Sequence, residues 1–415
     1  MKIAFVHGHL HLGGIETLML KLSRELRARG HELVILAGAG GNAELERELR
    51  RVAEVRFFPV SFVKAFPRLR APHTDGLADV DVFFAFGSPQ LLLAALIASR
   101  VAPSARVLAG VFSPWEYFPA HRSIRRDWRL ADRIFARLPD ENIIFMNEAC
   151  RAEHRRALGR SFDASPVIPL PVDIAPLPWP RPIDRTRIAS IGRLVAFKPY
   201  PFHMLGVLTE LRRRGIDVTY DVYGDGPERA RLEQAIADAG LDGRVRLRGT
   251  IDYSTIPTVL ANAQGFVGVG TAALDAAALG VPTVVAYESD EPLSLGFFHD
   301  TAPAEFGDAA SRGARYPLAR MIDDLLALHG GAYARTAALG IAHAAQFGTD
   351  RIADQYLETM ANARDCAHTF APFDYAAAVA TALIQKGLAV AGRRDPLSQR
   401  YFTRIAPPHA AASER

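Results

Sequence analysis

A proline-rich stretch divides this chain into two parts. Seven of the residues in 165–184 are proline, at positions 166, 169, 171, 176, 178, 180 and 182. Proline fixes the backbone φ angle and lacks an N–H donor, so this stretch is an extended connector rather than a core element. We place the connector at 171–186. The chain of 415 residues is long enough for two domains of ordinary size, one on each side of it.

The first part has the pattern of a βαβ unit. A β-rich run at 2–6 precedes a glycine-rich turn, a helical pattern over 15–30 and a second strand at 31–37. The apolar residues of the helical pattern are Ile15, Leu18, Leu22 and Leu26, and Gly30 is suited to end the helix. A helical crossover implies parallel strands. Further apolar runs at 81–87, 106–112 and 142–147 extend the pattern, so we predict a doubly wound α/β domain over 1–170.

The pattern restarts after the connector. Strand-like and helix-like stretches alternate from a strand at 187–193 to a strand at 281–288, and helical stretches follow to 364. We therefore predict a second doubly wound domain over 187–365. Residues 366–415 read as a helical extension that packs back on the first domain and ends in a disordered tail. Ligands of such sheets bind beyond the carboxyl ends of the strands, so we expect the domains to face each other across a cleft.

Composition narrows the functional classes. Two cysteines exclude a disulfide scaffold and fit a reducing compartment, and a net charge of +4 is too small to indicate nucleic-acid binding. The first residues turn polar too quickly for a signal peptide, and no apolar run is long enough to span a membrane. Two basic stretches, 55–70 and 121–139, are either solvated faces or contacts to an anionic membrane surface. We expect a cytoplasmic protein, peripheral at the inner face of the plasma membrane.

Three alternating histidines, His7, His9 and His11, suggest a metal site near the N-terminus. No compact set of carboxylates or cysteines lies nearby to complete one, so we predict no metal. The neighbouring pair Gly13-Gly14 favours another interpretation, because a glycine turn that opens a helix lets the backbone approach an anion such as a diphosphate. The histidines are then loop residues, with His11 nearest to a ligand.

Two further groups of residues follow expected strands. Arg193 and Lys198 lie in a loop after the strand at 187–193, where two cations could neutralise a diphosphate or simply face solvent. A second turn, Gly270-Thr271-Ala272, opens a helix that carries Asp275. A carboxylate there could accept hydrogen bonds from the vicinal hydroxyls of a ribose, or could only favour the helix N-terminus.

Taken in order, these motifs resemble the retaining GT-B glycosyltransferases of family 4, the glycosyl transferases group 1 type. The resemblance covers most of 1–365. It is carried by Gly13-Gly14-Ile15-Glu16, by Gly192-Arg193-Leu194 with Lys198, by Gly224-Asp225-Gly226-Pro227, and by the segment 267–285 with Gly280-Val281-Pro282.

The resemblance implies a nucleotide-diphosphate sugar as donor, bound mainly by the second domain, with the first domain taking the acceptor. Arg193 and Lys198 would then be the catalytic cations, which hold the diphosphate without a metal or other cofactor. The donor-binding residues would be Gly13, Gly14, Gly224, Gly270, Thr271, Ala272 and Asp275. The acceptor would meet His11, Ser113, Trp115 and Glu116. One departure is Val267, which stands where the family places the first carboxylate of a pair.

We therefore predict a retaining, metal-independent hexosyltransferase-type enzyme. It would move a sugar to a glycan or lipid-linked acceptor in bacterial surface polysaccharide or glycolipid biosynthesis, and it would bind no nucleic acid. Two alternatives stay open: a catalytically silent GT-B protein that binds a nucleotide sugar or scaffolds partners, and a GT-B sugar epimerase or phosphorylase.

Overall fold

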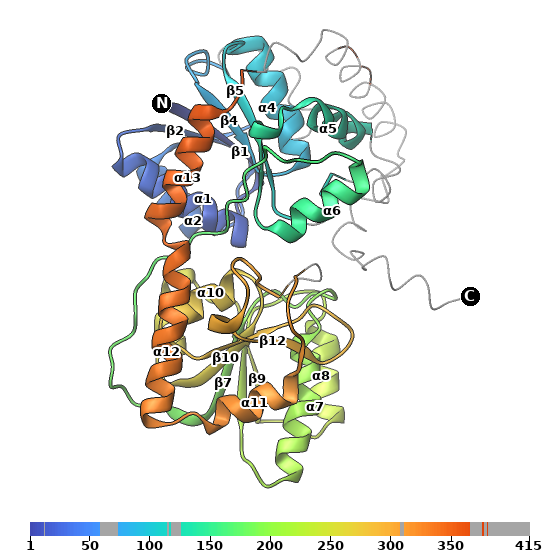
Figure 1. The fold of residues 1–415 in the computed structure, drawn as a ribbon, viewed down its shortest axis with the longest axis vertical. Coiled ribbons are helices and arrows are strands. Elements are labelled where there is room, and N and C mark those ends of the chain that lie inside the picture. The colour runs from blue at the N-terminus through green and yellow to red at the C-terminus, as the bar shows by residue number, and fades with distance from the viewer. Residues whose placement is uncertain are drawn as a thin grey trace, which may run out of the picture. The chain divides into compact units, whose positions relative to one another are not determined.

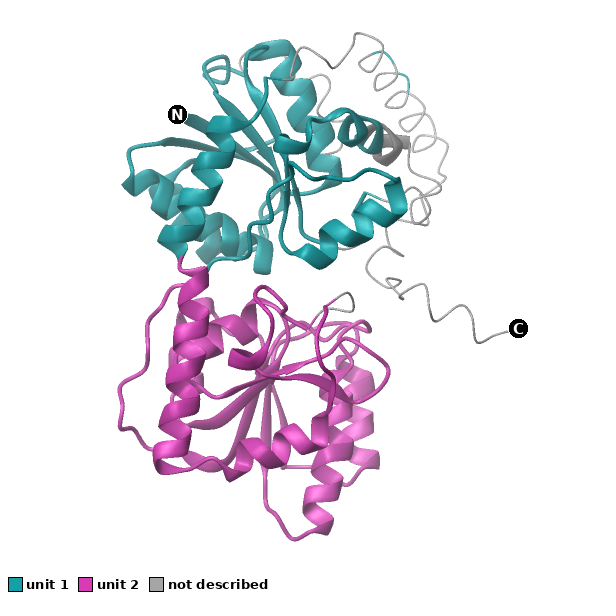
Figure 2. Ribbon diagram, in the orientation of Figure 1, with its two compact units in different colours: residues 1–171, 349–395 teal, residues 172–348, 396–415 magenta. Residues whose placement is uncertain are grey.

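The computed structural model describes residues 1–11, 13–58, 74–113, 116–117, 126–307 and 311–365, with Ala376 and Ala380 (Figure 1). For 126–130 it describes the backbone alone. The chain forms two compact units (Figure 2). Unit 1 contains Met1–Pro171 and the chain from Thr349 through the last described helix, and unit 2 contains Val172–Gly348.

Unit 1 is built on a six-stranded parallel sheet in the order β3-β2-β1-β4-β5-β6. This is the strand order of dinucleotide-binding Rossmann domains. The strands are β1 (Lys2–His9), β2 (Glu32–Ala39), β3 (Glu54–Phe57), β4 (Val82–Ala85), β5 (Arg106–Val111) and β6 (Ile143–Phe145). The prediction of a doubly wound α/β domain is confirmed.

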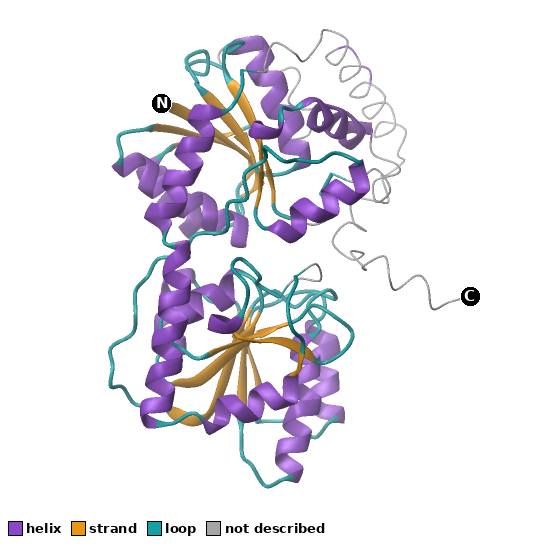
Figure 3. Cartoon of the chain, in the orientation of Figure 1, coloured by secondary structure: helices purple, strands orange, loops and turns teal. Residues whose placement is uncertain are grey.

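Helices cover both faces of this sheet (Figure 3). Successive side chains of a strand point to opposite faces, so Ile3 and Phe5 of β1 pack with one set of helices and Ala4 and Val6 with the other. The first set is α1 (Gly14–Ala28), α2 (Ala43–Val52) and α13 (Thr349–Asn362). The second is α4 (Ser88–Val101), α5 (Arg126–Arg137) and α6 (Glu148–Leu158), and a 3-10 turn, η3 (Asp140–Asn142), precedes β6.

Unit 2 contains a seven-stranded sheet in the order β13-β12-β11-β10-β7-β8-β9. The strands are β7 (Asp184–Ile191), β8 (Thr219–Tyr223), β9 (Val245–Gly249), β10 (Ala263–Gly268), β11 (Thr283–Ala286), β12 (Leu293–Phe297) and β13 (Tyr316–Pro317). Five strands are parallel, as the sequence predicts. The edge formed by β12 and β13 is antiparallel, because β12 turns straight back from β11 without a crossover helix.

The helices of unit 2 also form two layers. One layer is α7 (Tyr200–Arg213), α8 (Arg229–Asp238) and α11 (Leu318–Ala327). The other is α9 (Ile256–Leu260), α10 (Thr271–Ala278) and α12 (Gly330–Ala344). Three 3-10 turns join these elements, η4 (Tyr253–Thr255), η5 (Phe298–Asp300) and η6 (Ala345–Phe347).

The proline-rich connector is fixed to unit 2. The backbone N–H of Leu177 donates to the carbonyl of Leu279 at 3.0 Å. Trp179 stacks on Tyr333 with ring centroids 5.3 Å apart, and Arg181 donates to the backbone carbonyls of Ala261 and Gly280. The connector is therefore an ordered part of the second unit.

Helix α13 differs from its expected place. The sequence placed 350–364 in the second domain, whereas the structure packs this helix in unit 1. Its buried side chains Ile352, Tyr356 and Met360 join the core that contains Phe5 and Phe84. The apolar spacing identified the helix, but spacing alone does not say which of two similar sheets the helix covers.

The packing of α13 gives a first prediction. Tyr356 is fully buried and its ring contacts Phe84, with centroids 5.6 Å apart. We expect Tyr356→Ala to lower the free energy of unfolding of unit 1 by about 3–5 kcal/mol, measured by urea denaturation. The Tyr356 hydroxyl has no hydrogen-bond partner among the described residues. Tyr356→Phe should therefore leave the stability unchanged or raise it, and a large loss in this control would contradict the packing.

Candidate functional site

Four loops of unit 2 meet at one edge of its sheet. Strands β7, β8, β10 and β11 run parallel, so the residues that follow them lie at the same edge. The loops begin at Gly192 after β7, Gly224 after β8, Val269 after β10 and Tyr287 after β11. Ligands of open α/β sheets bind at this edge.

The loops after β7 and β8 are joined through their backbones. The N–H of Gly192 donates to the carbonyl of Tyr223 at 2.9 Å, and the N–H of Leu194 donates to the carbonyl of Asp225 at 3.0 Å. The N–H of Glu228 donates back to the carbonyl of Leu194 at 3.1 Å. These bonds fix the segment that carries Arg193.

Only glycine fits at Gly224 and Gly226. Their φ angles are +138° and +158°. A Cβ atom on Gly224 would lie 1.8 Å from the carbonyl oxygen of Gly192, and one on Gly226 would lie 2.2 Å from that of Leu194. Both contacts are with backbone, which cannot swing aside. The glycines of the Gly-Asp-Gly-Pro turn therefore act by allowing the two loops to touch.

Arg193 and Lys198 occupy this supported loop in different environments. Arg193 is exposed, whereas Lys198 is partly buried and its backbone N–H donates to the carbonyl of Val195. Burial lowers the pKa of Lys198 below its usual value, the carboxylate of Glu288 opposes this, and Arg193 adds to it. A cation in such surroundings gains from the arrival of a negatively charged ligand.

Glu288 is a site residue that the sequence analysis missed. It follows β11, and its backbone N–H donates to the carbonyl of Gly307 at 2.8 Å. Its charge acts on Lys198 and also helps to raise the pKa of Tyr200, mainly raised by burial. The Nε2 atom of His203 lies 3.1 Å from the carbonyl oxygen of Asp290, which ties this loop to α7. A carboxylate two residues after a buried strand was the signal in the sequence.

The third loop leads into α10. Gly270, with a φ angle of +67°, precedes the helix, and Thr271 and Ala272 form its first residues and are partly exposed. The first N–H groups of a helix have no partner within it and favour anions. Asp275 lies one turn further, 8% exposed, and accepts a hydrogen bond from the Tyr253 hydroxyl at 2.8 Å.

In unit 1, the turn Gly13-Gly14 begins α1 as the sequence indicates, and Gly13 is extended with a φ angle of −164°. Two histidines are placed differently from the prediction. His7 and His9 belong to β1 rather than to a loop, because the strand continues to His9. His7 is buried, and its Nε2 atom lies 2.9 Å from Oε1 of Glu16. This contact anchors the first turn of α1 to the sheet.

His9 and His11 stack on each other, with ring centroids 5.7 Å apart. Burial lowers the pKa of His9, and the positive charges of His11 and His7 lower it further. Across the part of the chain that the structure describes, no three His, Cys, Asp or Glu side chains gather as metal ligands.

Two of the expected acceptor residues, Ser113 and Glu116, follow β5, whereas His11 follows β1. The Oε2 atom of Glu116 accepts a hydrogen bond from the backbone N–H of Phe112 at 3.0 Å, so its carboxylate holds the turn at the end of the strand. Ser113 is partly buried in the same turn. Trp115 lies outside the described residues, as do 59–70 and 121–125 of the two basic stretches. No helix in the described part of the chain has the length and apolar character to cross a membrane.

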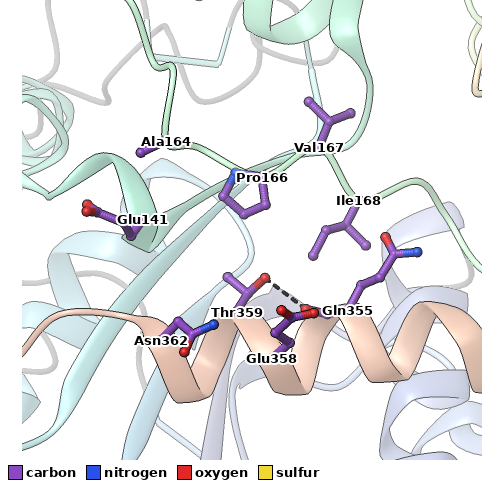
Figure 4. Close-up of a pocket in the computed structure, with 9 residues that line it drawn as sticks. All are labelled: Glu141, Ala164, Pro166, Val167, Ile168, Gln355, Glu358, Thr359 and Asn362. Carbon is purple, nitrogen blue, oxygen red and sulfur yellow. Dashed lines mark hydrogen bonds between the residues drawn. The ribbon is translucent and has the colours of Figure 1, made fainter.

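A pocket of about 390 Å³ in unit 1 lies elsewhere (Figure 4). Helix α13 and the segment around Pro166 form its walls, and the lining residues are Glu141, Ala164, Pro166, Val167, Ile168, Gln355, Glu358, Thr359 and Asn362. Glu141 precedes β6, so the pocket opens near the amino end of that strand. It contains none of the residues predicted for donor or acceptor.

Two family models match consecutive parts of the chain. Residues 12–175 match the model described as Glycosyltransferase Family 4, and residues 178–291 match the model described as Glycosyl transferases group 1. Together they span two thirds of the chain, and they divide it close to the boundary between units 1 and 2.

Individual relatives are more distant. The alpha-D-kanosaminyltransferase of Streptomyces kanamyceticus is 35% identical over 77 residues, which are 19% of this chain and only 20% of that protein. A GDP-mannose-dependent alpha-(1-6)-phosphatidylinositol monomannoside mannosyltransferase of Mycolicibacterium smegmatis is 27% identical over 68% of this chain and 78% of its own length. The Anabaena HepE structure, in complex with UDP and glucose, has a TM-score of 0.66 at 20% identity, covering 87% of this chain and 99% of that chain.

Two Rossmann-like units with these likenesses define the GT-B fold class. The chain belongs to the GT-B glycosyltransferases.

The interlocked loops give a second prediction. In Gly224→Ala the new Cβ atom overlaps the Gly192 carbonyl, so the loop that carries Arg193 must move. We expect a lower melting temperature and at least about tenfold weaker binding of nucleoside diphosphates, measured by thermal shift and calorimetry.

Gly243→Ala is the matched control. Gly243 also has a positive φ angle, +77°, but no described atom lies within 4 Å of its added Cβ. Gly243→Ala should therefore lose about 1–2 kcal/mol of unfolding free energy through backbone strain alone, and it should bind nucleoside diphosphates as the wild type does. Equal binding losses in both variants would show that strain, and not the contact between the loops, matters.

Proposed function

We propose that this protein transfers a sugar from a nucleotide-diphosphate sugar to a glycan or lipid-linked acceptor. The observation that carries the proposal is the pair Arg193 and Lys198, held on an interlocked glycine loop at the carboxyl edge of the unit 2 sheet. The relatives fit it, since one uses GDP-mannose and another was solved with UDP and glucose. A role in bacterial surface polysaccharide or glycolipid synthesis, at the inner face of the plasma membrane, is part of the proposal.

The donor would lie along this edge of unit 2. Lys198 and Arg193 would bind the diphosphate oxygens, and the N-terminus of α10 would face the phosphates. Asp275 would bind the ribose hydroxyls while Tyr253 holds its Oδ1 atom. Gly13 and Gly14 would contribute backbone N–H groups from unit 1.

The reaction is a substitution at the anomeric carbon. The bond from this carbon to the diphosphate oxygen breaks, the acceptor hydroxyl forms a new bond on the same face of the sugar, and the hydroxyl proton passes to the departing diphosphate. Negative charge grows on the diphosphate in the transition state, where fixed cations stabilise it most. With two cations in place, we propose that no metal is required. His11, Ser113 and Glu116 would face the acceptor.

A silent nucleotide-sugar-binding protein is the second candidate, and Val267 supports it. Val267 lies in β10 with no exposed surface and packs in the core of unit 2. It offers no carboxylate for a donor sugar. Calorimetric binding of a nucleotide sugar, without transfer to any acceptor in crude lipid or glycan extracts, would favour this candidate over the enzyme.

The catalytic assignment gives a third prediction. Arg193→Ala and Lys198→Ala should each lower turnover by about 10²–10³-fold, because each removes a charge from the departing diphosphate. Release of nucleoside diphosphate measures the rate, and addition of a chelator should leave the wild-type rate unchanged.

Arg185→Ala is the control for this experiment. Arg185 is an exposed arginine at the opposite end of the same strand, β7, so its loss should not change the rate. Unchanged turnover in both Arg193→Ala and Lys198→Ala would overturn the mechanism.

The pKa of Lys198 gives a fourth prediction. Lys198 must be protonated to bind the diphosphate, and burial lowers its pKa. The plot of kcat/KM against pH should therefore fall on its alkaline side below the pH at which an exposed lysine titrates.

Glu288→Gln tests the partner of Lys198. The negative charge of Glu288 raises the pKa of Lys198, so its removal lowers that pKa and moves the alkaline fall to lower pH. If kcat/KM of Glu288→Gln falls at the same alkaline pH as that of the wild type, Glu288 and Lys198 do not interact in solution.

A further inference from the structure

A cluster of arginines from β7 and β9 lies in unit 2 around a carboxylate on β8. Three guanidinium groups surround the carboxylate of Asp221 on β8. Arg187 Nε lies 2.6 Å from Oδ2, and Arg246 Nε and Arg248 Nε lie 2.7 Å and 3.0 Å from Oδ1. Arg246 Nη2 adds a contact of 3.1 Å to Oδ2. Asp221 therefore accepts four hydrogen bonds, as many as a carboxylate can.

The cluster is electrically unbalanced. Three positive charges face one carboxylate, which leaves an excess of two positive charges. Burial works to raise the pKa of Asp221, but the hydrogen bonds from Arg187, Arg248 and Arg246 outweigh it and lower the pKa. Asp221 is thus fully charged at neutral pH and has no further capacity to neutralise its neighbours.

The three arginines divide into one structural and two outer groups. Arg187 is buried, and its Nη groups donate to Asn262 Oδ1, to the Tyr223 hydroxyl and to the carbonyl of Val259. By contrast, the side chains of Arg246 and Arg248 are 36% and 44% exposed. Both belong to β9, the edge strand of the sheet.

The outer pair keeps guanidinium donors that an anion can use. Because both Nε atoms bond the same oxygen, Oδ1 of Asp221, the two guanidinium groups lie no more than two hydrogen-bond lengths apart. Arg246 also donates from Nη2 to Thr219 Oγ1 at 3.3 Å. Nη1 of Arg246 and both Nη groups of Arg248 then have no hydrogen-bond partner among the described residues. Guanidinium groups bind phosphate oxygens through parallel N–H bonds. An incoming anion also relieves the repulsion between the two cations.

We propose that Arg246 and Arg248, held by Asp221, form a binding site for a phosphate group. The site is separate from Arg193 and Lys198, so it does not rest on the proposed transferase activity. The alternative is that Arg246 and Arg248 only keep the edge strand from pairing with strands of other chains, as charged side chains on edge strands do. In that case the protein should show no specific anion binding at these residues.

Titration with inorganic phosphate tests the proposal on the full chain at constant ionic strength. We expect saturable binding that adds to any binding at the donor site and raises the melting temperature. Arg248→Gln should weaken this component at least about tenfold, since it loses a charge-assisted bond. Arg248→Lys keeps the charge but loses the planar group, so its phosphate affinity should lie between those of the wild type and Arg248→Gln. If Arg248→Gln fails to fold, the affinity of Arg248→Lys still tests the proposal. Binding should be weaker at pH 5.5 than at pH 7.5, because inorganic phosphate is almost entirely a monoanion at pH 5.5, whereas much of it is a dianion at pH 7.5.

Arg244→Gln is the matched control. Arg244 immediately precedes the same edge strand and pairs with a different carboxylate, that of Asp217. It should bind phosphate as the wild type does. Equal phosphate affinity in wild type and Arg248→Gln would overturn the proposal, as would binding of an acidic peptide without binding of phosphate.

Vesicles distinguish the source of the phosphate group. Co-sedimentation with phosphatidylcholine vesicles that contain phosphatidic acid, lost in Arg248→Gln and retained in Arg244→Gln, identifies a lipid headgroup. Phosphate binding that depends on Arg248, with equal sedimentation of the two variants, identifies a soluble phosphate.

Discussion

The candidate donor site depends on the contact between two backbones. The loop after β7 and the loop after β8 exchange hydrogen bonds between Leu194 and Asp225 and between Glu228 and Leu194. They can approach this closely only where Gly224 and Gly226 have no side chain. Main-chain contacts leave little freedom for adjustment, so the position of Arg193 follows from the sheet itself. The loop backbone therefore needs no rearrangement when a diphosphate arrives.

The sheet of unit 2 carries two groups of cations, each placed beside a carboxylate. At its carboxyl edge, partly buried Lys198 has Arg193 as a repelling neighbour and Glu288 as an attracting one. Around Asp221 the imbalance is larger. Buried Arg187 makes four hydrogen bonds, while Arg246 and Arg248 reach the surface. In both places a carboxylate from a neighbouring strand or loop allows cations to stand closer together than they otherwise would.

The sequence predicted the two α/β domains and the glycine turns because strand, turn and helix signals are local. It missed Glu288, since what makes this residue important is its proximity to Lys198, ninety positions earlier in the chain. His7 was expected in a loop, because glycine at position 8 hid the continuation of β1. Helix α13 was recognised as a helix but not assigned to unit 1. Each failure concerns which distant segments meet, a property that periodicity does not encode.

The placement of α13 has a consequence for how this protein can be divided or recombined. The chain leaves unit 1 after Pro171 and returns at Thr349, so unit 2 is an insertion within unit 1. A fragment ending at 171 would expose the apolar surface that Ile352, Tyr356 and Met360 cover. A chimera that exchanges the second unit with that of a relative must therefore have two junctions, and one junction near the connector would separate α13 from its own core.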